Sequence, residues 1–333
     1  SIEKRFFAMK QNKLTRWAAL ILAAAMTLSL TACGGAGSDS ASAGSASASQ
    51  SASASAITLT DQAGRQVELD APAETLVSCY YVTTYATMAL GISDRVVGLE
   101  KKADTRPIYA MAAPELLEKE QVGTMKELNL EAVAALEPDL VVMPKKLMDY
   151  AAPLEELGIP VLVVAPESHE ALTEMLELLG QTCGVENRAQ ALTDYYEEQL
   201  ARVAQLVDGL ERPTVYMGGN SSYLTAAPSD MYQSSLIETA GGVNAAGDLT
   251  GGYWTEVSYE SILAMAPQVI LIPAGADYTA QDILGDPQLA AVPAVQSGAV
   301  YEMPGGIEEW DSPIPSGILG TLWMTSVLHG DVY

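Results

Sequence analysis

Residues 129–144 read NLEAVAALEPDLVVMP, and residues 258–273 read SYESILAMAPQVILIP. Both copies place a Glu seven residues before one Pro and a second Pro six residues after that, and four of the 16 positions are identical. Apolar residues recur at helical spacing before the first Pro, and an apolar run lies between the two prolines. Each copy therefore predicts a short helix followed by a buried strand. An interval of 129 residues is too long for a solenoid repeat, so the duplication predicts two lobes of similar build.

Strand and helix patterns alternate through the rest of the chain as well. Short apolar runs, such as residues 75–78 and 160–164, are separated by segments of helical periodicity, which favours an α/β class with mostly parallel sheets. Residues 57–70 alternate apolar and polar positions around a central Gly and predict a β-hairpin at the start of the folded body.

A long helix is predicted to connect the two lobes. Residues 186–210 contain no Pro, and no Gly before Gly209, and their apolar residues recur every three or four positions. This segment separates a predicted first lobe, residues 57–185, from a predicted second lobe, residues 211–333.

The N-terminal residues have the features of an export signal. Residues 1–32 combine basic residues with an apolar run over residues 17–30, which is too short for a permanent membrane span. The run ends in Leu-Thr-Ala-Cys, and this pattern resembles the bacterial lipobox, in which the Cys, here Cys33, is diacylated; a plain secretory signal is the alternative. Residues 33–56 are almost entirely Ser, Ala and Gly and predict a flexible tether. Met9 is the expected start of the signal.

The charge distribution excludes some partners. The formal net charge is −25, a balance that disfavours nucleic acid and anionic lipid headgroups as partners. No Lys or Arg follows Arg212. Ligand contacts from the second lobe must therefore come from aromatic, hydroxyl, amide, carboxylate or backbone groups.

Several segments together resemble a known family. TLTDQAGRQVELD at residues 58–70, the duplicated pair, and PAVQSGAVYEMPG at residues 293–305 are similar to the substrate-binding lipoproteins of ABC importers for iron chelates and cobalamin. The resemblance covers residues 57–333. It implies two Rossmann-like lobes joined by one long α-helix, with the ligand in a cleft between the lobes.

The candidate ligand-binding residues lie in loops that should follow the carboxyl ends of the strands, where open parallel sheets bind ligands. Aromatic side chains with polar tips suit a large flat ligand such as a corrin, a porphyrin or a catechol chelate. The predicted set is Tyr80, Tyr81, Tyr85, Met125, Lys145, Asn220, Tyr223, Tyr253, Trp254 and Trp310. Each of these aromatic residues has the alternative of packing in a lobe core, and Lys145 that of an ordinary solvated lysine.

The remaining chemistry-bearing residues leave alternatives open. If the ligand is haem, Tyr80, Tyr81 and Met125 are the axial candidates, whereas the only histidines, His169 and His329, are expected to be structural. Cys79 and Cys183 either form a disulfide or lie unpaired in the core.

The resemblance also implies a partner and a location. The protein is expected on the extracytoplasmic face of the bacterial membrane, held by its lipid, passing an iron complex or cobalamin to an ABC permease with its ATPase. One acidic residue on each lobe is expected to contact the permease: Asp149, Glu155 or Glu156 on the first lobe, and Asp282 or Asp286 on the second. The alternative for each of them is an ordinary solvated surface carboxylate.

No catalytic motif is evident, so the chain is predicted not to be an enzyme, and no cofactor or protein-bound metal is predicted. Two other functions stay open. One is an anchored sensor or scavenger of the same ligand without a transport role. The other is a lipoprotein hydrolase using carboxylates such as Glu308, Glu309 and Asp311, although these fit the polar rim of a cleft better.

Overall fold

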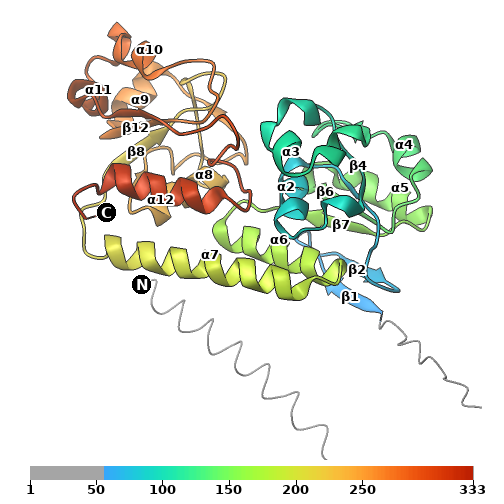
Figure 1. Cartoon of the computed structure of the whole chain (residues 1–333). Helices are drawn as coiled ribbons and strands as arrows, with labels where there is room; N and C mark the ends of the chain where they lie inside the picture. Colours follow the sequence, from blue (N-terminus) through green and yellow to red (C-terminus); the bar gives the residue numbers. More distant parts are fainter. Residues whose placement is uncertain (1–55, 333) are drawn as a thin grey trace, which may run out of the picture. The chain divides into compact units, whose positions relative to one another are not determined.

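The computed structural model describes residues 56–332, and these form two α/β lobes (Figure 1). The predicted signal, the lipidation site Cys33 and most of the predicted tether lie outside the described residues. The elements β1–β7 with α2–α5 are called the N lobe below, and β8–β13 with α8–α12 the C lobe.

The N lobe is built on a five-stranded parallel sheet with the strand order β5-β4-β3-β6-β7. Its strands are β3 (Leu76–Ser78), β4 (Val96–Glu100), β5 (Glu120–Gly123), β6 (Leu140–Pro144) and β7 (Val161–Val164). Its helices are α2 (Tyr81–Ala89), α3 (Pro107–Ala112), α4 (Leu130–Ala135) and α5 (Ala151–Glu156), with 3₁₀ turns η2 (Ser93–Arg95), η3 (Ala103–Thr105), η4 (Pro114–Glu118) and η5 (Lys145–Tyr150). The predicted hairpin is present as β1 (Ile57–Thr60) and β2 (Gln66–Leu69), paired antiparallel.

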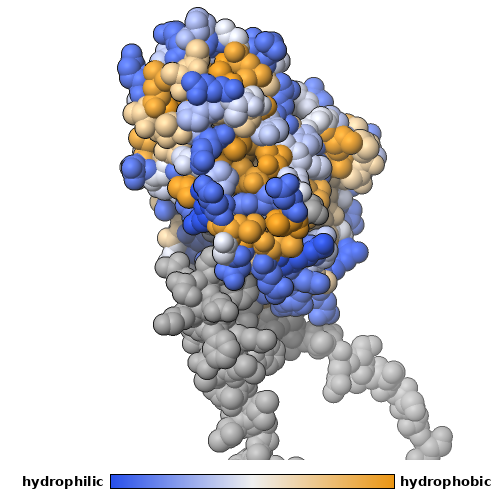
Figure 2. Space-filling model, turned by 90° about the vertical axis from the view of Figure 1, so that its left-hand side faces the viewer, coloured by the Kyte–Doolittle hydropathy of each residue, from blue (hydrophilic) through white to orange (hydrophobic). Residues whose placement is uncertain are grey.

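The C lobe repeats this plan with a four-stranded parallel sheet in the order β10-β8-β12-β13. Its strands are β8 (Thr214–Met217), β10 (Val243–Asn244), β12 (Val269–Ile272) and β13 (Val300–Glu302), and a small antiparallel pair is formed by β9 (Thr225–Ala226) and β11 (Thr255–Glu256). Its helices are α8 (Tyr232–Thr239), α9 (Tyr259–Met265), α10 (Ala280–Leu284), α11 (Pro293–Ser297) and α12 (Gly317–Leu328), with the 3₁₀ turn η6 (Pro287–Leu289). On the face of this lobe drawn in Figure 2, apolar side chains are interspersed with hydrophilic ones, as is usual for a protein surface.

The duplicated segments adopt the same local structure in both lobes. Asn129 and Ser258 cap the helices α4 and α9, since each side chain accepts a hydrogen bond from a backbone amide three residues ahead. Both helices give way to a left-handed residue directly before the Pro, Glu137 in one copy and Ala266 in the other, each with φ 46°. The Pro cannot continue the helix, and the chain turns into the buried strand β6 or β12.

The duplication extends to the way each strand joins its sheet. The residue after the Pro, Asp139 in the N lobe and Gln268 in the C lobe, donates its backbone N–H to the carbonyl of Thr75 or Thr214, respectively. Its side chain in turn accepts a hydrogen bond from the backbone N–H of the same Thr. The two halves are therefore alike in hydrogen bonding as well as in sequence pattern.

The helix α7 (Glu186–Val207) runs along the base of both lobes, as the periodicity predicted (Figure 1). A second helix, α6 (His169–Thr182), packs against it and was not predicted from the sequence. One buried apolar cluster continues from the N lobe through α6 and α7 into the C lobe, from Leu59 to Met324. The lobes therefore share a core at the base.

Buried polar groups lie at the same junction. The ring of His169 at the start of α6 contacts the Tyr196 hydroxyl through Nδ1 and the Thr321 hydroxyl through Nε2, each at 3.2 Å. Tyr196 in turn contacts the Tyr232 hydroxyl at 2.9 Å. Burial lowers the pKa of His169 to about 4, so the ring is neutral at physiological pH. His329 lies beside the Gly241 carbonyl at 3.4 Å.

Both described cysteines are buried and free. Cys79 lies in the apolar cluster on one face of the N-lobe sheet, whereas Cys183 belongs to the cluster shared with α6 and α7 on the other face. The sheet between them explains why the disulfide alternative is wrong. Among the residues described, no helix is long and apolar enough to cross a membrane.

Candidate functional site

A cavity of about 540 Å³ lies between the two lobes. Its lining comes from segments that follow the carboxyl ends of strands in both sheets, including β3, β6 and β7 of the N lobe and β8 of the C lobe, which is where parallel sheets place ligands. The lining residues are Tyr80, Tyr81, Arg106, Met125, Pro144, Lys145, Lys146, Val164, Ala165, Pro166, Glu167, Asn220, Met231, Tyr232, Gln233, Gly252, Tyr253, Trp254, Glu309, Asp311, Ser312 and Pro313.

The N-lobe wall begins with two aromatic rings at the start of α2. Tyr80 is the N-cap residue and Tyr81 opens the helix, and their rings meet edge to face with centroids 5.0 Å apart. The hydroxyl of Thr83 donates to the Tyr80 carbonyl at 2.7 Å, and Ser78 donates to the same carbonyl at 3.1 Å. These buried hydroxyls fix the helix start and therefore the direction of both rings.

Arg106 crosses the N-lobe wall on top of Tyr81. Its guanidinium carbon lies 3.9 Å from the centre of the Tyr81 ring, a cation–π contact. On one side Nη1 donates to Glu309 of the C lobe at 3.2 Å, and on the other Nε lies 3.8 Å from the buried carboxylate of Glu100. Burial lowers the pKa of Arg106, but Glu309 and the other neighbouring acidic groups raise it by more than that. The net shift of the pKa is therefore upward, and the side chain is a permanent cation.

Glu100 supports Arg106 from behind. Its carboxylate accepts hydrogen bonds of 2.7 Å from both the Thr84 and the Tyr109 hydroxyls. Burial raises the pKa of Glu100, while these hydrogen bonds and Arg106 pull it down by less. The contact between Glu100 and Nε of Arg106 therefore orients the guanidinium inside the lobe, while Nη1 faces the cleft and bonds to Glu309.

The C-lobe wall is formed by α8 and by the loop after β13. Tyr232 and Gln233 come from the first turn of α8, and Asp311 and Ser312 from the loop. Gln233 Nε2 donates to the Asp311 carbonyl at 3.0 Å, which ties the loop to the helix. Burial, and to a smaller extent the charge of Glu309, raise the pKa of Asp311 to about 6 against the opposing effect of hydrogen bonds from nearby N–H groups.

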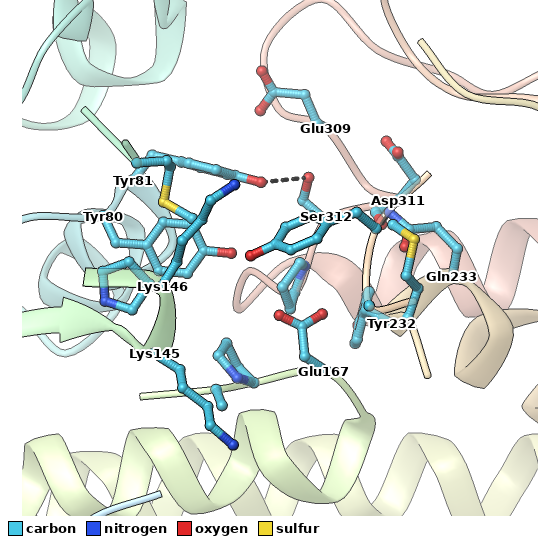
Figure 3. A pocket seen from close by; sticks show the side chains of 18 of the residues that line it. Tyr80, Tyr81, Lys145, Lys146, Glu167, Tyr232, Gln233, Glu309, Asp311 and Ser312 are labelled. Atoms are coloured by element: carbon cyan, nitrogen blue, oxygen red, sulfur yellow. Dashed lines mark hydrogen bonds between the residues drawn. The ribbon is translucent and has the colours of Figure 1, made fainter. Parts of the chain in front are cut away.

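Contacts between the walls are present on two sides of the cavity. The Tyr81 hydroxyl donates to the Ser312 hydroxyl at 3.0 Å (Figure 3), and the Tyr85 hydroxyl donates to Glu309 at 3.2 Å. Lys146 Nζ lies 4.3 Å from the centre of the Tyr253 ring. These contacts tie the two walls together, and because helices at the base join the lobes, any opening motion is expected to be small.

Seven of the ten predicted ligand residues line the cavity, namely Tyr80, Tyr81, Met125, Lys145, Asn220, Tyr253 and Trp254. The other three lie elsewhere. Tyr85 is one helical turn below Tyr81 and only 3% exposed, because the loop predicted for this segment is in fact α2. Tyr223 donates to Asp286 at 2.8 Å, and Trp310 packs against the shared apolar cluster.

Sequence reasoning missed several lining residues. Arg106 follows a 3₁₀ turn just beyond a predicted cleft loop, and nothing in its local sequence indicates that it folds back over Tyr81. Gln233 was assigned to no site, while Glu309 and Asp311 were assigned only to a polar rim. Glu167 lies in the segment that leads from β7 to α6, so its place in the cavity depended on the helix that was not predicted.

The predicted docking residues are found on the surface, but three of them also have structural contacts. Asp149 and Glu156 are exposed on η5 and α5, and Glu155 is ion-paired with Arg65. Asp282 completes a capping box with Thr279 at the start of α10. The Asp286 carboxylate accepts hydrogen bonds from two tyrosine hydroxyls, at 2.8 and 2.9 Å.

Three curated relatives are similar over most or much of the chain. An uncharacterized ABC transporter substrate-binding lipoprotein, YvrC, of Bacillus subtilis is 29% identical over 270 residues, which cover 78% of this chain and 80% of the relative. The molybdate-binding protein MolA of Haemophilus influenzae is 26% identical over 301 residues, 81% and 84% of the two chains. A cobalamin-binding protein of Halobacterium salinarum is 28% identical over 228 residues, 66% and 59% of the two chains.

The fold is shared with a solved structure. The periplasmic solute-binding protein of Veillonella parvula superposes with a TM-score of 0.70 at 26% identity and covers 83% of this chain and 87% of its own. Two parallel-sheet lobes around a cleft are the architecture of a solute-binding protein. Residues 76–306 match the family model described as periplasmic binding protein, and the chain belongs to that family.

Membership of this family rules out one of the alternative functions, the lipoprotein hydrolase. The family consists of solute-binding proteins of ABC transporters, which are not enzymes, so the hydrolase hypothesis is wrong. Within the described residues, no group of three or more His, Cys, Asp or Glu side chains is arranged to hold a metal ion.

Proposed function

We propose that this solute-binding protein captures a tetrapyrrole-type metal chelate, with a corrinoid such as cobalamin as the first candidate, and delivers it to an ABC permease. The observation that carries the proposal is the pairing of aromatic side chains from both lobes across one cavity. Tyr80 and Tyr81 face it from the N lobe, and Tyr232, Tyr253 and Trp254 from the C lobe. Aromatic faces bury the apolar plane of a macrocycle while their polar tips remain hydrogen-bonded.

The charges of the lining favour a solute of low net charge. Three cations, Arg106, Lys145 and Lys146, are matched by three carboxylates, Glu167, Glu309 and Asp311. A strongly anionic ferric siderophore would meet as much repulsion as attraction here. Cobalamin, which carries neutral amide side chains and a single phosphate, suits such a balance, and one relative is described as a cobalamin-binding protein.

Haem is the second candidate, because the axial candidates Tyr80, Tyr81 and Met125 all line the cavity. The lysines and Arg106 offer partners for its propionates. Burial raises the pKa of Tyr81 to about 12, so the phenol is neutral and would have to lose its proton to bind ferric iron as a tyrosinate. This raised pKa makes haem the weaker candidate.

The lipid anchor and the permease contacts belong to the same proposal. Cys33 would hold the protein on the outer face of the cell membrane through residues 33–56. The contacts to the permease would come from Asp149 or Glu156 on the N lobe and from Asp282 or Asp286 on the C lobe. A sensor or scavenger role would use the same cleft without these contacts.

Titration of the purified mature protein with cyanocobalamin, haem, a ferric catecholate siderophore and molybdate tests the proposal. Tyr and Trp fluorescence quenching reports binding, since five aromatic residues line the cavity. A dissociation constant below about 10 μM, tighter than about −7 kcal/mol, is expected for cyanocobalamin. If only molybdate or the siderophore binds in that range, the tetrapyrrole assignment is wrong.

A further inference from the structure

Two buried acceptor atoms in the C-lobe wall have no hydrogen-bond partner among residues 56–332. They are Oδ1 of Asp311 and Oε1 of Gln233, and the two side chains are only 3% and 7% exposed. The orientation of the Gln233 amide is fixed, because its Nε2 donates to the Asp311 carbonyl, and this leaves Oε1 as the unpaired atom. Both residues line the cavity.

An unpaired acceptor in this position is unfavourable, because a buried oxygen loses its hydrogen bonds to water and gains nothing in return. Native proteins keep few such groups, and functional sites are one of the places where they occur. Two of them on one wall of a ligand cavity therefore indicate that the missing donors are supplied by the solute.

The C lobe supplies no cation that could donate to these two oxygens. The last Lys or Arg of the sequence is Arg212, which precedes the first strand of the C lobe. Arg106, the lining cation that is ion-paired with the C lobe, is engaged with Tyr81 and Glu309. The Tyr232 hydroxyl beside Gln233 already contacts Tyr196.

The two walls also differ in charge. The cations of the lining, Arg106, Lys145 and Lys146, all belong to the N lobe. Of the three carboxylates, Glu167 follows β7, whereas Glu309 and Asp311 come from the C lobe; Figure 3 labels these three and both lysines. A solute with an anionic end and a donor-rich end therefore has complementary partners in only one orientation.

We propose that Asp311 and Gln233 form a subsite that selects the N–H donors of primary carboxamides on the rim of the solute, while the N-lobe cations face its anionic group. The inference rests on the proposed function and adds to it the chemical groups that the C lobe recognises. Asp311 is ionised at pH 7.5, since the pKa of its carboxyl is about 6, and an ionised carboxylate accepts such bonds strongly while repelling a carboxylate on the solute.

Two corrinoids with the same ring test the subsite. Dicyanocobinamide has carboxamide side chains, and dicyanocobyrinic acid has carboxylates in their place. At pH 7.5 the wild-type protein is expected to bind the carboxamide form about 100-fold more tightly or better, because a site built for hydrogen-bond donors rejects analogues that lack them. Binding is measured by fluorescence quenching and by calorimetry.

Variants then assign the selectivity to these side chains. Asp311→Asn keeps the shape but removes the charge, so it should reduce the preference at least about tenfold, and Gln233→Leu should weaken binding of the carboxamide form alone. Asp248→Asn, an exposed Asp of the same lobe outside the lining, is the matched control and should keep the wild-type preference. Circular dichroism verifies that each variant is folded.

The outcomes separate the two proposals. Equal affinity of the wild type for both corrinoids, or an unchanged preference in Asp311→Asn, would overturn the subsite and leave the corrinoid function standing. If neither corrinoid binds, the proposed function fails, and the subsite fails with it.

Discussion

Replacing Asp311 by Asn should make the protein more stable at neutral pH, as expected where a binding site keeps a buried charge at a cost in stability. Burial raises the pKa of this carboxyl from 3.8 to about 6 in the folded chain, whereas in the unfolded chain it titrates at its ordinary value. A difference of about two pKa units corresponds to about 3 kcal/mol, since one unit is about 1.4 kcal/mol. The wild type carries this penalty above pH 6, and Asn does not.

The sign of the pH dependence follows from the direction of the shift. Because the folded state binds the proton more tightly than the unfolded state, the wild type gains stability as the pH falls from about 6 to about 4. The stability difference between Asp311→Asn and wild type should therefore be larger at pH 7 than at pH 4, by about 2–3 kcal/mol. Other titrating groups cancel in this difference, except Glu309, whose charge acts on Asp311 directly.

Urea unfolding of both proteins between pH 4 and 7.5, followed by Trp fluorescence, measures the effect. Any constant offset from the buried Asn amide is removed by comparing the two ends of the pH range. A difference that stays the same across the range would show that the carboxyl is not desolvated in the folded protein. The unpaired oxygen would then be solvated, and the reasoning about the C-lobe wall would be refuted.

Three further predictions concern other parts of the molecule. Trp254→Ala should weaken binding of the solute at least about tenfold, because Trp254 lines the cavity. Trp310→Ala, outside the lining, should lower stability by about 3 kcal/mol and leave the affinity of the folded protein unchanged. Titration and thermal unfolding distinguish the two effects, and equal losses of affinity in both variants would contradict the placement of these residues. Ala266→Gly should stabilise the chain by about 0.5–1 kcal/mol, because Gly has no steric penalty at φ 46°, and a lower unfolding midpoint in urea would count against it. His169→Gln should reduce the loss of stability on acidification. The pKa of His169 is about 4 in the folded chain, so protonation below about pH 6.5 favours the unfolded chain. If the stability difference between the variant and the wild type does not change between pH 6.5 and 4, the ring is not buried and neutral.

The parts of the fold that could be predicted are those whose signals are local. The duplicated helix–strand unit, the hairpin and the long helix α7 have a period, a cap or a proline within a few residues of each boundary, and all three are present. Helix α6 has the same signals, with Ser168 as its cap, so its omission was an error of interpretation and not a lack of pattern. The limits proposed for the two lobes stay a prediction.

The cavity was predicted less completely, because side-chain direction depends on contacts far apart in sequence. Tyr81 and Tyr85 are four residues apart on one helix face, yet only Tyr81 lines the cavity. The Tyr85 ring is buried against the rings of Tyr81 and Tyr109. Arg106 gains its place from Glu100, Tyr81 and Glu309, which are up to 203 residues away along the chain. Composition alone did indicate that the second lobe would use no cation.

The uneven distribution of lysine and arginine along the chain has a consequence for delivery. The cations of the cavity all belong to the N lobe, where Glu167 is the one lining carboxylate, whereas the C lobe contributes Glu309 and Asp311 and no cation, so the more positive side of the cavity is the N lobe. A dipolar solute would settle with its negative end toward that lobe on every binding event. The permease would then receive each solute molecule in the same orientation. The opening of the permease would need to fit only one of the two ends of the solute.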